Sequence, residues 1–264
     1  MNCSCFSAAT IALSLILSAP LLVAADPAAA GQALVKRYAD VIVGVELVVT
    51  VKLRMGDREV PPREQRIEVN GTVISPQGLT VTSLADVDPQ VMFEAARAAQ
   101  PGGRVPELVG ADFKEVKLRL ADGTEGPARF VLKDVDLDLA FIAPEASAEM
   151  KTFAYVDLGN EAEGAVLGSY YYVARAPKTL QRVPLIRATS VAGIVERPRR
   201  LFLMTELTPG TPVFDTGGKV LGLTLQNFAN GRRTGYVVLP AADIAEMAKQ
   251  ASSAQSASGA SSGK

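Results

Sequence analysis

The chain has 264 residues, of which 48% are hydrophobic and 21% are charged, so its composition is that of a folded protein and excludes disorder along the whole length. Its 27 basic residues are balanced by 28 acidic ones, which excludes a general affinity for nucleic acid. The chain contains no histidine, so Ser-His-Asp catalysis, Cys-His catalysis and imidazole metal sites are excluded as well.

The first segment of the chain, from about Phe6 to Ala25, is apolar. Its small final residues, Ala24 and Ala25, are typical of a signal-peptidase site, so residues 1–25 are predicted to be a signal peptide. The same stretch is long enough to span a bilayer, and an uncleaved membrane anchor is the alternative. Cleavage would give a secreted or periplasmic (cell-envelope) protein with no membrane span.

Both ends of the mature chain have compositions that do not favour burial. Residues 26–34 are rich in Ala, Pro and Gly and are expected to be a leader without regular structure, and residues 250–264 form a Ser/Ala/Gly tail that is expected to be disordered. The two cysteines, Cys3 and Cys5, precede the predicted cleavage point. The mature chain is therefore expected to have no disulfide, and its core must stabilise the fold alone.

Between these ends, short β-branched stretches alternate with turn residues, a pattern typical of an all-β sandwich or barrel. The first predicted strand is Val41–Leu53, and a loop around Pro61-Pro62 is expected to end it. Helices are predicted over Val91–Ala99 and Ala241–Ala248. The other predicted strands are Arg66–Ser75, Leu79–Thr82, Val116–Leu120, Ala128–Leu132, Leu139–Ala143, Ala165–Ala174, Val191–Val195, Leu201–Thr205, Val220–Leu225 and Gly235–Leu239.

A break near Pro144–Met150 divides the strands into two sets of similar size, which predicts two small barrels over residues 35–145 and 146–249, the second including the C-terminal helix. Four stretches then carry a resemblance to a known family, in the order and spacing that the family has. They are Gly71–Ser83, Val116–Thr124 with Asp136–Ile142, Ala192–Val195, and Pro209–Leu223. The chain resembles the trypsin-fold serine peptidases of the HtrA (Deg) type, which implies two antiparallel six-stranded β-barrels.

Carried over to this sequence, the catalytic positions of that family are degenerate. The histidine position falls on Ala85, or on Leu84 if the alignment shifts by one residue, whereas the aspartate position is kept as Asp138. The nucleophile loop is shortened to Pro209–Pro212 and has no serine. The shortening also removes backbone that would form an oxyanion hole. The resemblance therefore implies a degenerate member without a catalytic residue at Ala85, Asp138 or Pro209.

Two other interpretations were weighed for the acidic residues around Asp138. Without an imidazole to orient, this carboxylate is expected to accept backbone N–H groups at the start of a strand. Asp134, Asp136 and Glu145 have the spacing of a calcium loop, but Leu139 stands where that loop needs glycine. We therefore predict no metal and no cofactor.

These features favour an exported pseudoprotease that binds a peptide or a protein partner without cleaving it. The alternative is an active serine-type endopeptidase or hydrolase with displaced residues, for which Thr208 and Thr211 are the nearest hydroxyls. The basic clusters Arg197-Pro198-Arg199-Arg200 and Arg232-Arg233 are interpreted as solvated loop charges. The sequence predicts no oligomeric state.

Overall fold

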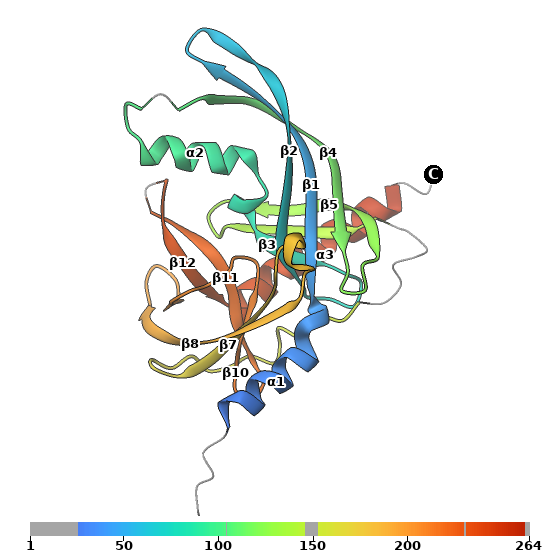
Figure 1. Ribbon diagram of the computed structural model, residues 1–264, viewed down its shortest axis with the longest axis vertical. Helices are drawn as coiled ribbons and strands as arrows, with labels where there is room; N and C mark the ends of the chain where they lie inside the picture. Colours follow the sequence, from blue (N-terminus) through green and yellow to red (C-terminus); the bar gives the residue numbers. More distant parts are fainter. Residues whose placement is uncertain (1–25, 104, 146–152, 230, 262–264) are drawn as a thin grey trace, which may run out of the picture.

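The structure, a computed structural model, describes residues 26–103, 105–145, 153–229 and 231–261. Its strands form two closed antiparallel barrels, in the orders β1-β2-β3-β6-β5-β4 and β10-β11-β12-β9-β8-β7 (Figure 1). The predicted fold, two six-stranded barrels with a C-terminal helix, is confirmed. The strands are β1 Ile42–Met55, β2 Arg58–Val73, β3 Thr80–Ser83, β4 Glu107–Arg119, β5 Glu125–Asp134, β6 Leu139–Pro144, β7 Ser169–Arg175, β8 Pro184–Val195, β9 Leu201–Met204, β10 Pro212–Asp215, β11 Val220–Ala229 and β12 Arg232–Pro240.

The inner faces of the barrels follow from the two-residue period of the strands. In β1, Val43, Val45 and Leu47 are fully or almost fully buried and pack with Leu118 of β4 and Ile142 of β6. A second cluster fills the other barrel in the same way. A third cluster includes residues of both barrels and of the two terminal helices, so apolar packing continues across the junction.

The predicted loop at Pro61-Pro62 is wrong, because both prolines lie inside β2. The register of the β1–β2 pair shifts between Val51 and Leu53, whose partners are Arg63 and Val60, so neither proline has a ladder partner in β1. A proline has no N–H to donate, and a bulge is one of the few places in a sheet where that loss costs little.

The expectation of an unstructured leader at residues 26–34 is also wrong. Helix α1, Pro27–Tyr38, begins there, with Asp26 as its N-cap: the Asp26 carboxylate accepts the Ala28 N–H at 2.9 Å. Proline at the first helical position is favourable because its missing N–H would have no helical partner. Leu34 and Tyr38, four residues apart, are buried on one face of the helix against the second barrel.

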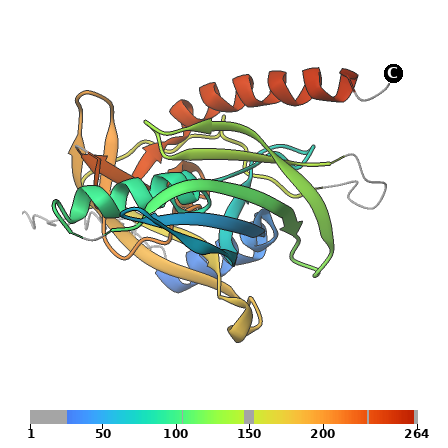
Figure 2. The same ribbon diagram turned by 90° about the horizontal axis from the view of Figure 1, so that it is seen from above.

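The C-terminal helix α3, Ala241–Ser261, is longer than predicted, and the described part of the expected tail, up to Ser261, is helical. Its first turns are held by the buried side chains Ala241 and Ile244, so the following residues extend an existing helix instead of nucleating one. Alanine has the highest helix propensity, and the Ser252 hydroxyl donates to the Ala248 carbonyl at 2.8 Å. Figure 2 shows α3 lying across the barrels.

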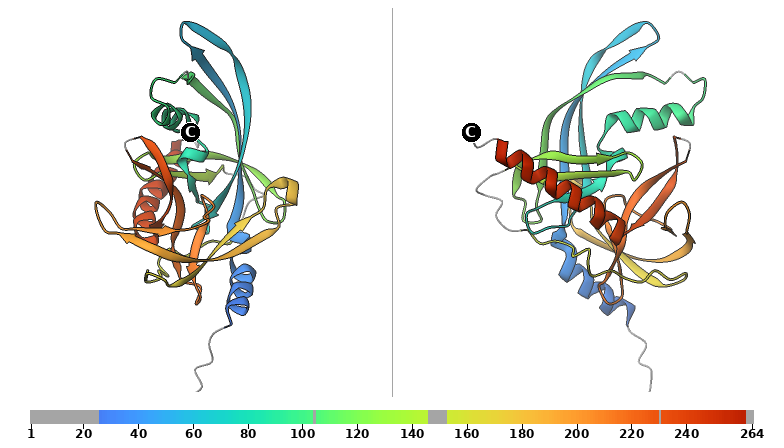
Figure 3. Two further views of the ribbon diagram at one scale, coloured as in Figure 1. Left: turned by 60° about the vertical axis from the view of Figure 1, so that its left-hand side comes forward. Right: turned by 180° about the vertical axis from the view of Figure 1, so that it is seen from behind.

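The predicted internal helix is present as α2, Pro89–Ala99, capped by the Asp88 carboxylate. It follows a short 3-10 turn, η2 (Leu84–Asp86), and lies between the long first-barrel strands and the β11–β12 hairpin (Figures 1 and 3). The hairpin contacts the helix directly, since the Arg232 Nε donates to the Ala98 carbonyl at 2.8 Å. α2 therefore covers the junction of the two barrels on one side.

Among the described residues, no helix is both long enough and apolar enough to cross a membrane. The predicted signal peptide, residues 1–25, lies outside the described residues, as do residues 262–264 of the expected tail and most of the predicted break near Pro144–Met150.

Candidate functional site

Asp138 lies immediately before β6 and is only 2% exposed where the two barrels meet. One carboxylate oxygen, Oδ1, accepts the backbone N–H of Ala85 at 2.7 Å. The other, Oδ2, accepts the Ser83 hydroxyl at 2.6 Å and the backbone N–H of Gln226 at 2.7 Å. Ser83 and Ala85 belong to the first barrel and Gln226 to the second, so this side chain joins the barrels. It does accept backbone N–H groups at the start of a strand, as predicted.

Burial raises the pKa of the Asp138 carboxyl to about 6, because a charge is poorly solvated in this position. The Ser83 hydroxyl and the N–H groups of Ala85 and Gln226 act in the opposite direction, since each stabilises the ionised form. The backbone of Asp138 has a φ of 57°, in the left-handed region that aspartate tolerates better than most residues. Both the left-handed backbone of Asp138 and its ionised carboxylate are therefore unfavourable by themselves, and the hydrogen bonds from Ser83, Ala85 and Gln226 stabilise the ionised form.

The position assigned to histidine is occupied by Ala85, a buried methyl group in the turn η2. Its backbone makes the contact with Asp138 that is described above, but its side chain carries no acid or base. Leu84, the alternative position, is also buried, and its N–H donates to the Asp138 carbonyl at 2.9 Å. Neither alignment places a titratable group beside Asp138 at this point.

The shortened loop at Pro209 closes against the first barrel. Gly210 has a φ of 72°, and its carbonyl accepts the Thr72 hydroxyl at 2.8 Å. A Cβ at Gly210 would lie 2.2 Å from the Asn70 carbonyl oxygen and 2.7 Å from the Thr82 hydroxyl. Only glycine fits this close approach. The loop therefore fills the space between the barrels at this level.

The hydroxyl of Thr211 is committed to its own loop. It donates to the Thr208 carbonyl at 2.6 Å, and Thr211 is fully buried. The N–H of Gly210 donates to the Thr224 carbonyl at 2.8 Å, and the Thr224 N–H donates to the Thr211 carbonyl at 2.9 Å. Both N–H groups are thus engaged inside the second barrel and do not point into an open cleft.

Ala85, Asp138 and Gly210, the neighbour of Pro209, lie at one junction of the barrels. Ala85 and Asp138 are hydrogen-bonded to each other, and Gly210 contacts Thr82, the neighbour of the Asp138 donor Ser83. On the other side, β11 carries Gln226, two residues beyond the Thr224 that pairs with the shortened loop. The spacing of the sequence motifs is therefore matched by the fold.

A cavity of about 410 Å³ adjoins this junction, between η2, α2 and the β11–β12 hairpin. Its volume lies in the range of small-molecule and side-chain pockets. One face of α2 forms a wall of small and apolar side chains, and polar groups come from η2 and the hairpin. The lining residues are Val69, Ala85, Asp86, Met92, Ala95, Ala96, Ala99, Gln226, Phe228 and Arg233.

Sequence reasoning missed the polar groups of this cavity. The side-chain amide of Gln226 donates to the Asp86 carboxylate. Burial raises the pKa of Asp86, while the Arg233 charge and hydrogen bonds from Gln226 and Ser83 lower it. Arg233 is exposed, as expected of a solvated charge, but it also lines this cavity. Nothing in the sequence shows that the hairpin folds over α2. One signal for Asp86 was available in the sequence: it directly follows Ala85, the residue at the histidine position.

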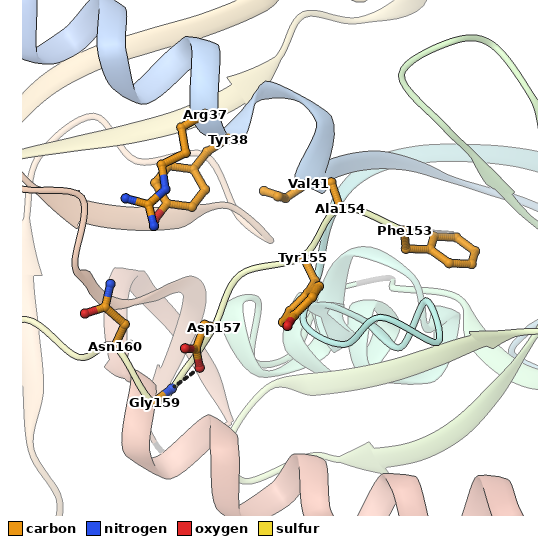
Figure 4. Close-up of a pocket in the computed structure, with 9 residues that line it drawn as sticks. All are labelled: Arg37, Tyr38, Val41, Phe153, Ala154, Tyr155, Asp157, Gly159 and Asn160. Carbon is orange, nitrogen blue, oxygen red and sulfur yellow. Dashed lines mark hydrogen bonds between the residues drawn. The ribbon is translucent and has the colours of Figure 1, made fainter. Parts of the chain in front are cut away.

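A second cavity, of about 660 Å³, shares no residue with the first (Figure 4). It lies beside the end of α1, and its polar side chains are Arg37, Asp157 and Asn160, with Tyr38 and Tyr155 (Figure 4). The Asp157 carboxylate accepts the Gly159 N–H at 2.9 Å. None of the predicted catalytic positions lines this cavity.

The acidic run that resembles a calcium loop is used locally. Asp134 accepts the Leu137 N–H at 2.8 Å, and the Asp138 carboxylate is engaged as described. In the part of the chain that the structure describes, no group of three or more His, Cys, Asp or Glu side chains is arranged to hold a metal ion.

Two closed six-stranded antiparallel barrels are the architecture of the trypsin fold. The family model for the trypsin-like peptidase domain matches residues 69–223, more than half of the chain. The chain therefore belongs to the trypsin-like peptidase domain family. No curated protein matches it in sequence.

Solved structures show the same fold at low sequence identity. The MamO protease domain of Magnetospirillum magneticum is 15% identical with a TM-score of 0.51, over 80% of this chain and 97% of that one. Deg5 is 16% identical with a TM-score of 0.54, over 83% and 92%. The serine endoprotease of Yersinia pestis is 13% identical with a TM-score of 0.55, over 83% and 65%. The resemblance to peptidases of the HtrA (Deg) type is thus confirmed for the fold.

Proposed function

We propose that this protein is a pseudoprotease of the trypsin fold that binds a peptide or protein segment without cleaving it. The observation that carries the proposal is the pairing of Asp138 with the backbone of Ala85 in a chain without histidine. A serine or threonine hydroxyl is a weak nucleophile unless an adjacent base removes its proton. No imidazole can serve here, and the nearest loop hydroxyl, that of Thr211, donates to Thr208.

The surroundings of the junction support a binding role. β10 pairs with β11 only as far as Leu223, so the stretch from Leu225 to Phe228 has no strand on that side among the described residues. The N–H groups of Thr224 and Gln226 are already engaged, by Thr211 and Asp138, so an extended peptide can add to this edge only beyond Gln226, where the cavity beside Ala85 can receive one of its side chains. Phe228, at this end of β11, lines the cavity together with residues of α2.

The alternative function, hydrolysis with displaced residues, is favoured by family membership alone. It would require Thr208 or Thr211 as nucleophile and a lysine as base. Among the described residues, no lysine lines the cavity at the junction. We therefore place the enzyme second to the binding module.

The test combines an activity assay with a binding assay on the purified chain. A fluorophosphonate probe and unfolded casein should give no labelling and no cleavage, because no activated hydroxyl is present. Hydrolysis that disappears in Thr208→Val or Thr211→Val would overturn the proposal. Hydrolysis unchanged in both variants would indicate a contaminating protease, to be removed by further purification before the assay is repeated.

Binding is measured with fluorescently labelled casein peptides. Phe228→Lys, which places a charge in the wall of the cavity, should abolish binding. Leu180→Lys is the matched control, since Leu180 is 61% exposed on the β7–β8 connection and lines no part of the cavity. Peptides that bind both variants equally, or bind neither variant nor the wild type, would contradict a binding role for this cleft.

We further propose that the protein is exported to the periplasm or secreted, with residues 1–25 as the signal. The apolar stretch ending at Ala24-Ala25 supports this proposal. N-terminal sequencing of the native protein tests it. A first residue at Asp26 is expected, whereas an intact Met1 would indicate a retained anchor.

A further inference from the structure

The cavity beside Ala85 contains one cation without a carboxylate partner. Arg233, in β12 opposite Phe228, is exposed at the rim of the cavity and forms no ion pair with any described residue. Its guanidinium donates to the Tyr236 hydroxyl and lies over the ring of that tyrosine, with Cζ 4.6 Å from the ring centroid. The ring thus holds the guanidinium in place without neutralising it.

The neighbouring Arg232 adds a second positive charge to the same hairpin. Its Nε donates to the carbonyl of Ala98 at the end of α2, and it likewise has no carboxylate within ion-pair distance among the described residues. This bond fixes the hairpin against the helix, so the charges of Arg232 and Arg233 stay next to the mouth of the cavity.

Asp86 is the acidic residue of the cavity, and no ion pair joins it to Arg233. Its carboxylate already accepts a hydrogen bond from the Gln226 amide; burial raises its pKa, and the charge of Arg233 lowers it. Asp86 lies on η2 and is partly buried, whereas Arg233 is exposed. An anionic group would therefore meet the guanidinium before it approached Asp86.

The rest of the wall is suited to a chain segment of modest size. Met92, Ala95, Ala96 and Ala99 are spaced along one face of α2, and Phe228 faces them from the hairpin. The small side chains leave room for the backbone of a bound peptide, and burial of an aliphatic group against the apolar surface is favourable. A ligand that carries an aliphatic group next to a carboxylate matches both the wall and the rim.

We infer that the cleft selects peptides that present a carboxylate to Arg233, either the C-terminal carboxylate or an Asp or Glu side chain. The inference rests on the proposed peptide-binding function and names the class of peptide. A guanidinium binds a carboxylate through two parallel hydrogen bonds, which gives selectivity as well as affinity.

The experiment uses four labelled peptides with one aliphatic sequence. The first has a free C-terminus and no acidic residue, the second is amidated with one Glu, the third is amidated with Gln in its place, and the fourth is amidated without either residue. Fluorescence polarisation should show the carboxylate peptides binding about tenfold more tightly than their neutral counterparts, which corresponds to about 1.4 kcal/mol. The first and second peptides distinguish the terminal from the side-chain carboxylate.

The variant Arg233→Gln should remove this preference, so that carboxylate and neutral peptides bind it equally. Arg97→Gln is the matched control, because Arg97 is an exposed arginine of α2 that lines neither this cavity nor the neighbouring one. Arg233→Lys, which keeps the charge, should keep part of the preference. Circular dichroism melting curves of all variants establish that they are folded.

The outcomes separate the two proposals. Equal binding of all four peptides to the wild type, or a preference that persists in Arg233→Gln, would overturn the carboxylate selectivity and leave the binding function standing. Failure of every peptide to bind at millimolar concentration would overturn both.

Discussion

The guanidinium of Arg182 occupies the place where any residue other than glycine at position 44 would carry its side chain. A Cβ on Gly44 would lie 2.3 Å from the Arg182 Nη1. Gly44 belongs to β1 of the first barrel, and Arg182 to the connection between β7 and β8 of the second. The Arg182 Nη2 lies 2.8 Å from Glu46 and 2.6 Å from Glu68. The missing side chain of Gly44 in the first barrel thus leaves room for the Arg182 guanidinium of the second barrel, which forms ion pairs with two carboxylates of the first.

The first prediction is that Gly44→Ala lowers the free energy of unfolding by about 2 kcal/mol, the order of magnitude for lost hydrogen bonds to charged groups. The methyl group would displace the guanidinium, which is free to swing away, so the loss comes from its bonds to Glu46 and Glu68. Urea unfolding measures the change. Arg182→Ala should cost a similar amount, and the double variant should cost little more than either one.

Gly110→Ala is the control for this experiment. Gly110 lies in β4, and the nearest atom to a Cβ there is the Lys52 Cδ at 3.9 Å. The control should be neutral or slightly stabilising, because alanine restricts the unfolded chain. Equal losses in the two glycine variants would show that Arg182 has no part in the effect.

The second prediction concerns Gly210. Gly210→Ala should prevent folding or cost more than 3 kcal/mol, because the new methyl group would lie 2.2 Å from the Asn70 carbonyl oxygen, a backbone atom that cannot rotate away. Gly123→Ala is the control that measures the cost of the left-handed backbone without a steric clash, since Gly123 has a φ of 88° with open space around it. It should cost only about 1 kcal/mol. Thermal unfolding of the two variants, compared with the wild type, checks the difference.

The barrels could be predicted because their strands repeat apolar residues with a period of two, and because Asp138 directly precedes a run of buried residues. Helix α1 was missed for a different reason. Its Ala and Gly content indicates a leader, but Asp26-Pro27 is a helix start signal, and Leu34 and Tyr38 have helical spacing. The composition and the capping residues of this segment point to different structures, and the capping residues agree with the helix that forms.

The cavity could not be predicted from the sequence, because its residues come from segments more than a hundred positions apart. Asp86 and Gln226 meet only when β11 of the second barrel is placed against η2 of the first. Arg233 faces the cavity only because the hairpin bends over α2. A pattern along the chain reports local periodicity and contains no information on such long-range contacts.

The third prediction tests how α1 is attached to the second barrel. The Tyr38 hydroxyl donates to the Gly218 carbonyl at 2.7 Å, and its ring stacks on Phe214 with the centroids 4.0 Å apart. Tyr38→Phe keeps the stacking but leaves the carbonyl unpaired, and should cost about 1 kcal/mol in urea unfolding. Tyr155→Phe, at a side chain that is 45% exposed, should change nothing. Equal effects in both variants would contradict the assigned role of the hydroxyl.

The last prediction follows from the pKa of Asp138, which burial raises to about 6, against about 3.9 for an unfolded chain. The folded state binds this proton more tightly than the unfolded state does. The contribution of Asp138 to stability is therefore fully present below about pH 4, falls as the pH rises, and is lost above about pH 6. Two pKa units correspond to about 3 kcal/mol over this window.

Urea unfolding of the wild type and of Asp138→Asn at pH 4, 5, 6 and 7 measures this contribution, because other carboxyls titrate in both proteins and cancel in the difference. The variant should be less stable at every pH, since its amide must point a donor at the N–H of Ala85 or Gln226. Its deficit in unfolding free energy should be largest at pH 4 and smallest at pH 7.

Ser83→Ala, which removes a donor to the ionised form, should move the midpoint of the wild-type profile to higher pH. A deficit that is constant from pH 4 to 7 would show that Asp138 remains ionised throughout, and that its three hydrogen bonds outweigh its burial.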